Sequence, residues 1–208
     1  MQLKNFENIK NIIFDLGNVI INLDEEATRD AFESIFGGDY DNVMEELQND
    51  KVFEKYETGN ISTQTFLNEL GAFAEESNHD ELRYAWNAML LDIPKERYKL
   101  LEKCKNEYKT FCLSNTNKLH IDFIYKNLKK TKNIDNLNGY FDKVYLSHEI
   151  KMRKPNTDIF EKVLKENGLN PSETLFIDDT EGHLEGAKSL GIQTFHLTED
   201  IDISDLFI

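Results

Sequence analysis

The sequence predicts a doubly wound α/β protein with a mostly parallel sheet and an inserted helical domain. Two observations point to this fold class. Short runs rich in β-branched and aromatic residues have the composition of buried strands. They lie at 11–14, 109–113, 143–147, 174–178 and 193–197. Amphipathic helical patterns separate the later runs, and strands that alternate with helices are typical of βαβ units with parallel pairing.

The clearest helix follows the third strand run. Between residues 156 and 168 apolar side chains recur at helical spacing, Asn156 or Thr157 can cap the start, and Gly168 can end the helix. Residues 181–191 repeat the pattern after the fourth run. Both helices therefore have the length and position of crossovers between neighbouring parallel strands.

The segment from residue 24 to residue 94 has a different character. It offers no convincing strand pattern, and it is longer than a simple crossover needs. Its helical patterns fall at 25–36, 40–50, 62–76 and 80–90. We therefore predict a Rossmann-like α/β core made of residues 1–23 and 95–208, with residues 24–94 forming a small helical domain over the edge of the sheet.

Composition narrows the class of partner. The 208-residue chain has 24 basic and 39 acidic residues, a net charge of −15, so we expect no binding to nucleic acid or to anionic membranes. The two cysteines, Cys104 and Cys112, lack metal-ligand spacing and are predicted to be reduced thiols. No targeting or membrane-spanning pattern is apparent. We expect a cytoplasmic protein that is a monomer or a weak homodimer.

Polar residues follow four of the strand runs. Open parallel sheets bind ligands at the carboxyl ends of their strands, so these residues are expected to meet at one edge. They are Asp15 after the first run, Ser114 and Asn115 after the second, Lys151, Arg153 and Lys154 after the third, and Asp178 and Asp179 at the end of the fourth. This combination is far more informative than any single member.

Each of these residue types has a role in phosphoryl transfer. A carboxylate such as Asp15 can attack phosphorus and form an aspartyl-phosphate. Asp15 beside Asp178 and Asp179 would be a costly cluster of like charges unless a cation sat among them, and Mg²⁺ suits such an all-oxygen site. Ser114 can hold phosphate oxygens, and Lys154 can neutralise charge in the transition state.

In this order, each behind a strand run, these residues resemble the four motifs of the haloacid dehalogenase superfamily of phosphohydrolases. The helical insertion resembles the C1 cap of that superfamily. The stretches FDLGNVI, LSNTNKLH, MRKP, FIDD and EGAKSLGI, with YETGNIS in the cap, are similar to the bacterial α-D-glucose-1-phosphate phosphatase branch. The resemblance covers nearly the whole chain.

The resemblance implies specific roles at the matching positions. Asp15 would be the nucleophile, and Mg²⁺ would be bound by Asp15, the Gly17 carbonyl and Asp179. Asp178 would contact the metal directly or through water. Phosphate would be bound by Ser114 and Lys154, and the amide of Asn115 can reach the substrate.

Gly17 departs from the pattern of most phosphatases of this superfamily. They carry an aspartate two residues after the nucleophile, where it protonates the leaving alcohol and later activates water. Three interpretations follow. The leaving group can be acidic, as an anomeric sugar oxygen is; a cap residue such as Glu57 or Tyr56, or a bound water, can replace the acid; or the protein senses a phosphorylated compound and turns it over poorly.

Other polar residues near the strand ends have more ordinary explanations. Asn18 can orient the loop or the substrate. His120 and His183 are predicted to have core or surface roles, and Trp86 to pack within the cap. The two cations that precede Lys154 are predicted to be solvated.

The sequence thus predicts a Mg²⁺-dependent phosphatase that acts on a small phosphorylated metabolite, favoured to be a sugar with an anomeric phosphate. One alternative is a 2-haloacid dehalogenase, which uses a similar aspartate without a metal. The other is a non-catalytic regulatory protein that binds a phosphorylated metabolite, which the missing acid at Gly17 would explain.

Overall fold

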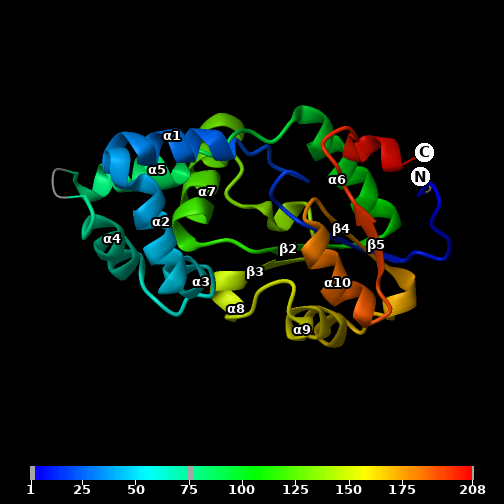
Figure 1. Ribbon diagram of the computed structural model, residues 1–208. Helices are drawn as coiled ribbons and strands as arrows, with labels where there is room; N and C mark the ends of the chain where they lie inside the picture. Colours follow the sequence, from blue (N-terminus) through cyan, green and yellow to red (C-terminus); the bar gives the residue numbers. More distant parts are fainter. Residues whose placement is uncertain (1–2, 75–76, 208) are drawn as a thin grey trace.

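The structure is a computed structural model that describes residues 3–74 and 77–207. A parallel sheet of five strands in the order β3-β2-β1-β4-β5 forms its centre. The strands are β1 (Asn11–Phe14), β2 (Lys109–Ser114), β3 (Lys143–Leu146), β4 (Thr174–Asp178) and β5 (Gln193–His196). Every predicted strand run is present, and the α/β fold class is confirmed (Figure 1).

Helices cover both faces of this sheet. One face carries α6 (Lys95–Glu107), α7 (Lys118–Lys132) and the turn η4 (Ile203–Leu206), and the other carries α9 (Thr157–Asn167) and α10 (Glu181–Ser189). Successive side chains of a strand point to opposite faces. Ile12 and Phe14 of β1 therefore pack with α6 and α7, whereas Ile13 packs with α9 and α10. This alternation explains why the run is apolar throughout.

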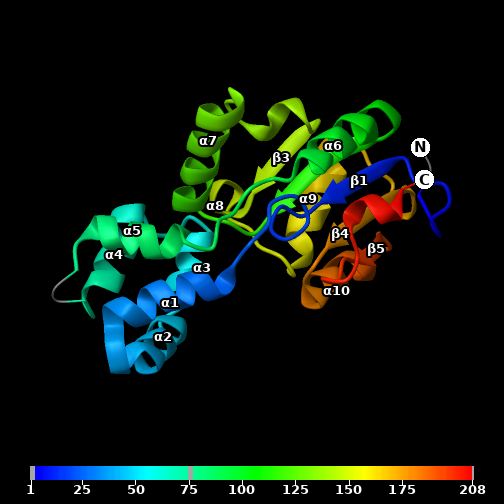
Figure 2. The same ribbon diagram turned by 90° about the horizontal axis from the view of Figure 1, so that it is seen from above.

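The insertion after β1 is helical, as predicted. It contains α1 (Glu25–Phe36), η1 (Gly37–Asp39), α2 (Tyr40–Asn49), α3 (Val52–Glu57), α4 (Thr63–Gly71) and α5 (His79–Asn87). These helices form the cap, which has its own apolar cluster around Phe32, Phe66 and Leu70. In Figures 1 and 2 the cap lies at one end of the molecule and both termini lie at the other. The boundaries at residues 24 and 94 remain our proposal.

Several local details differ from the sequence prediction. The predicted helix at 62–76 ends at Gly71, and its residues 75–76 lie outside the described residues. Ser147 does not end a strand but begins the short helix α8 (Ser147–Ile150). Asn156 holds the N-cap position of α9, but its side chain makes no capping hydrogen bond. The turns η2 (Leu137–Gly139) and η3 (Pro171–Glu173) precede β3 and β4.

Helix α3, which the sequence patterns did not reveal, docks the cap onto the core. The backbone N–H of Leu119, in α7, donates to the Tyr56 hydroxyl at 3.1 Å. The Ser147 hydroxyl, in α8, donates to the Glu57 carbonyl at 2.7 Å. These two bonds fix the end of α3 beside the carboxyl ends of β2 and β3.

Close packing just after α3 strengthens this docking. Gly59 has φ +63°, and a Cβ built there would lie 2.1 Å from the carbonyl oxygen of His148 in α8. Only glycine therefore fits without moving backbone. Within the described ranges, no helix is long and apolar enough to cross a membrane.

Candidate active site

The carboxyl ends of β1 and β4 bring together the residues predicted for phosphate chemistry. In Figure 2 the arrow of β1 points toward the cap, so its end faces the junction between cap and core. The Lys154 ammonium lies 2.7 Å from Asp15 Oδ1 and 2.6 Å from Asp178 Oδ2. Lys154 and Asp178 are both fully buried, and Asp15 is 7% exposed. The three charges therefore form one ion cluster inside the protein.

Asp179 extends this cluster into a candidate metal site. Carboxylate oxygens of Asp15, Asp178 and Asp179 all lie within 4.8 Å of one another. Three carboxylates at such distances repel each other, and the single ammonium of Lys154 leaves the cluster net negative. A divalent cation would compensate that charge, and a hard, all-oxygen donor set suits Mg²⁺. The residues present therefore fit this ion.

The pKa values of the cluster follow from burial and pairing. Burial raises the pKa of Asp15 to about 6; Lys154 opposes this rise and Asp178 adds to it. Burial by itself would raise the pKa of Asp178, but the contacts with Lys154 and His183 lower it by more. The pKa of Asp178 is therefore below its ordinary value. Burial lowers the pKa of Lys154 less than Asp15 and Asp178 raise it, and the ammonium keeps its proton.

Two residues outside the predicted metal and phosphate site, Asn18 and His183, contact these carboxylates. The Asn18 amide donates to Asp179 Oδ2 at 3.0 Å, while its oxygen accepts from the Leu23 backbone at 3.1 Å. Asn18 thus orients an acidic residue of the site. His183 Nδ1 lies 3.1 Å from Asp178 Oδ1, so the surface or core role predicted for His183 was wrong. Its place in the first turn of the helix after β4 was the available signal.

Ser114 and Asn115 follow β2, as predicted, but they make different contacts. The Asn115 side chain pairs with the Lys154 backbone, accepting from its N–H at 2.9 Å and donating to its carbonyl at 3.0 Å. Asn115 thereby holds the segment that carries Lys154, and its contact with substrate remains a prediction. The Ser114 hydroxyl only approaches the Asn115 carbonyl, at 3.4 Å. Asn117 caps α7.

The backbone conformation at residue 17 does not require a glycine, because the φ of Gly17 lies outside the left-handed region. A Cβ at this position would lie 2.9 Å from Cδ1 of Leu23. The space next to residue 17 is thus occupied by an apolar side chain. The Gly17 carbonyl, which the family resemblance assigns to the metal, accepts a hydrogen bond from the Val19 N–H at 2.5 Å.

A cavity of about 350 Å³ opens between these strand ends and the cap. This volume is at the lower end of the range for small-molecule sites. Its polar wall is formed by Glu57, Ser114, Asn115, Asn117, His120 and Arg153. Its apolar wall is formed by Ile21, Leu23, Phe53, Trp86, Met89 and Leu90. The cavity also reaches Leu16 and Gly17, which directly follow Asp15, whereas Asp15, Lys154, Asp178 and Asp179 do not line it.

Two cap-facing predictions have different outcomes. Trp86 packs within the cap as expected, with its ring stacked on Phe53 at 5.6 Å. Arg153 was predicted to be solvated, which is wrong: it lines the cavity and its Nε lies 2.8 Å from Glu57 Oε2. The reason is that α3, missing from the predicted helices, places a carboxylate directly opposite Arg153.

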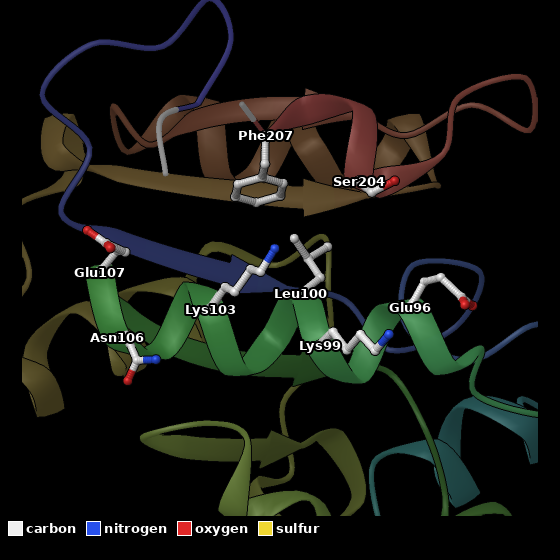
Figure 3. A pocket seen from close by; sticks show the side chains of 8 residues that line it. All are labelled: Glu96, Lys99, Leu100, Lys103, Asn106, Glu107, Ser204 and Phe207. Carbon is white, nitrogen blue, oxygen red and sulfur yellow. The ribbon is translucent and has the colours of Figure 1, made fainter.

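A further cavity, of about 610 Å³, lies between α6 and the C-terminal segment. Figure 3 shows Phe207 over α6 beside Leu100, with the charged side chains of Glu96, Lys99 and Lys103 spread along the helix. This cavity does not include any of the residues at the strand carboxyl ends. The smaller cavity under the cap, which does include residues at the ends of β1 and β2, is therefore the candidate substrate site.

The sheet, the cap and the buried Asp15–Lys154–Asp178 cluster define the class to which the protein belongs. Residues 9–191 match the haloacid dehalogenase-like hydrolase family, and the chain is a member of that family. The D-ribitol-5-phosphate phosphatase of Bacteroides thetaiotaomicron is 30% identical to it over 188 residues, which are 90% of this chain and 91% of that protein.

Solved structures agree with this membership. A haloacid dehalogenase family enzyme from Bacteroides thetaiotaomicron, in complex with magnesium and inorganic phosphate, superposes with a TM-score of 0.86 and 37% identity, covering 96% of this chain and 100% of that one. A predicted haloacid dehalogenase-like hydrolase from Porphyromonas gingivalis gives a TM-score of 0.81 and 32% identity, with 93% of each chain covered. The superfamily resemblance is confirmed; the finer resemblance to the glucose-1-phosphate phosphatase branch stays a prediction.

Proposed function

We propose that this protein is a Mg²⁺-dependent phosphatase that hydrolyses a small phosphorylated sugar or polyol through an aspartyl-phosphate on Asp15. The observation that carries the proposal is the buried ion cluster in which Lys154 contacts both Asp15 and Asp178. Similarity to a named phosphatase and to a magnesium–phosphate complex supports the reaction class and the cofactor. The small cavity supports a small substrate.

The residues of the cluster divide the work of phosphoryl transfer. Asp15 attacks phosphorus, so that a difficult hydrolysis becomes two easier steps. Lys154 stabilises the charge that develops on the transferred phosphoryl group, and the uncommitted Ser114 hydroxyl can bind one of its oxygens. Asp179, the Gly17 carbonyl and Asp178, directly or through water, would hold Mg²⁺ beside Asp15. When bound, this ion neutralises the acidic cluster and the phosphate together.

The two alternatives remain distinguishable. A 2-haloacid dehalogenase needs no metal, whereas the acidic triad of Asp15, Asp178 and Asp179 favours one. A non-catalytic binding protein would have no use for a nucleophile paired with a buried lysine. Formation of a covalent phosphoryl-enzyme on Asp15 would exclude it.

Two observations favour different positions for the phosphate on the substrate. The missing carboxylate at Gly17 favours an acidic leaving group such as an anomeric oxygen. The similarity to an enzyme named for a terminal polyol phosphate favours a primary alcohol instead. We propose the broader class, sugar and polyol phosphates, in a protein that we still expect to be cytoplasmic and monomeric or weakly dimeric.

A substrate panel tests this proposal. Release of phosphate from α-D-glucose 1-phosphate, D-ribitol 5-phosphate and 4-nitrophenyl phosphate is measured with Mg²⁺ and with EDTA, and halide release from a 2-haloacid serves as the competing assay. We expect hydrolysis of phosphate esters only, and only with Mg²⁺. Activity that survives EDTA, or halide release, would overturn the proposal. Asp15→Asn is the matched inactive control.

A further inference from the structure

We propose that the Glu57 carboxyl of the cap takes the place of the general acid and base that is absent at Gly17. The inference rests on the proposed phosphatase function. It names the group that protonates the leaving alcohol and afterwards activates water.

The position that carries the general acid in most phosphatases of this superfamily has no room for one as the structure stands. Gly17 has no side chain, and Leu23 occupies the space into which one would extend, 2.9 Å from the ideal Cβ. Neither residue can transfer a proton. A side chain that supplies the proton would therefore come from another element that lines the same cavity.

The other candidates are committed elsewhere. Tyr56 is 2% exposed, and its hydroxyl contacts the Leu119 N–H at 3.1 Å and the Thr63 hydroxyl at 3.0 Å. His120 is also committed, since its Nε2 lies 2.9 Å from the Trp86 carbonyl, which can only accept. Burial lowers the pKa of His120 to about 4, so its ring is neutral at physiological pH.

Glu57 has the position and the surroundings that the role needs. It lines the cavity together with Gly17 and Ser114, and its side chain is 23% exposed. The hydrogen bond from Ser147 to its carbonyl fixes its backbone against the core. A docked, partly desolvated carboxyl is therefore presented to the cavity from the cap.

Charges around Glu57 suit a group that gains and loses a proton. Burial raises its pKa, and Arg153, His183 and Lys154 oppose this rise. Glu54, one turn earlier on α3, is a second carboxylate near Arg153, at 4.0 Å. Burial favours the protonated form that donates, while the cations stabilise the carboxylate that remains after donation.

Glu57 exchanges one proton in each of the two steps of the proposed reaction. Asp15 forms a bond to phosphorus as the bond to the leaving oxygen breaks, and that oxygen takes the Glu57 proton to become an alcohol. The Glu57 carboxylate then takes a proton from water as the water oxygen bonds to phosphorus. The Asp15–phosphorus bond breaks, its electron pair returns to Asp15, and phosphate leaves.

The test compares Glu57→Gln with Glu54→Gln, a matched change on the same helix. For wild type and both variants, kcat/KM is measured with Mg²⁺ on a series of phosphate esters, from 4-nitrophenyl phosphate to D-ribitol 5-phosphate. An acid matters most for poor leaving groups, since positioned acids contribute about 10²–10⁴-fold. Glu57→Gln should lose about that factor on the polyol ester and less than about tenfold on the aryl ester. Glu54→Gln should resemble wild type.

Each outcome is decisive. A steeper dependence on leaving-group pKa in Glu57→Gln alone supports the proposal, as does partial recovery on the polyol ester in Glu57→Asp, which retains a carboxyl. Equal loss on all esters, or no loss, overturns it. Thermal unfolding of each variant separates misfolding from loss of proton transfer. If Glu57→Gln does not fold, the same ester series measured on Glu57→Asp tests the proposal. A wild type that hydrolyses no ester overturns the phosphatase function itself, and with it this inference.

Discussion

Replacing Asp15 by asparagine should stabilise the metal-free protein at neutral pH although it abolishes hydrolysis. Burial raises the pKa of Asp15 from its ordinary 3.8 to about 6, against the pull of Lys154. Below about pH 4 the carboxyl is protonated in the folded and the unfolded state, so it adds no pH dependence. Between about pH 4 and 6 the unfolded chain ionises first, and the folded protein loses stability as pH rises.

The size of this loss follows from the pKa values. One pKa unit corresponds to about 1.4 kcal/mol, so ionised Asp15 costs the folded protein about 3 kcal/mol at pH 7 and above. Asparagine is nearly isosteric with the protonated carboxyl and carries no charge. Lys154 retains Asp178 as its partner at 2.6 Å. The variant should therefore match wild type near pH 4 and exceed it by up to about 3 kcal/mol at pH 7.5.

Urea unfolding in EDTA at several pH values between 4 and 7.5 measures this difference. Asp122→Asn is the control, because Asp122 forms an exposed ion pair with Lys118 at 2.9 Å and its loss should cost at most about 1 kcal/mol at any pH. Mg²⁺ at a hundred times Kd should stabilise wild type by about 2.7 kcal/mol and the variant much less, which removes most of the difference between them. A pH-independent offset, or a variant less stable than wild type at pH 7.5 in EDTA, would refute the reasoning.

Three further substitutions test separate parts of the site. Gly17→Asp should be tolerated, because the backbone φ lies outside the left-handed region and only the end of the Leu23 side chain must move. In a Glu57→Gln background it should recover part of the lost factor of about 10²–10⁴ on polyol esters; a failure to recover any would show that Leu23 keeps an acid out of this position. Asn18→Ala should weaken Mg²⁺ binding in calorimetry by about 10–100-fold, as loss of a group that orients a ligand does, and unchanged affinity would contradict that role. Gly59→Ala should lower the stability measured in urea by at least about 2 kcal/mol, since it adds left-handed strain to a steric clash; a neutral effect would show that α3 is not tightly docked.

The α/β core could be predicted well from the sequence, because the patterns that indicate its strands are local. An apolar run such as residues 11–14 must be a buried strand, and the carboxyl ends of parallel strands must share one edge. These two rules are enough to place Asp15, Ser114, Lys154 and the pair Asp178–Asp179 at one edge of the sheet from the sequence alone. The same rules explain why each predicted strand run is a strand in the structure.

Contacts that depend on side-chain direction were beyond this reasoning. No pattern shows that the Asn115 amide pairs with the Lys154 backbone, and the position of His183 in the first turn of its helix does not fix the direction of its ring. Both depend on how helices and loops pack after the strands have formed. The short helix α3 was not predicted, because its six residues include too few apolar positions to show a helical period.

The docking of α3 gives Glu57, one of the cap residues that the sequence offered as a replacement acid, a fixed position on the core. A carboxyl at residue 17 would act from the core whether or not the cap was in place. A proton from Glu57 is available only while α3 is docked through Ser147 and the close contact at Gly59. On this proposal, water exclusion by the cap and proton delivery to the leaving group become a single event. Gly59→Ala should then reduce turnover of polyol esters more than of aryl esters, because an undocked cap removes the acid but leaves Asp15 and Lys154 in the core.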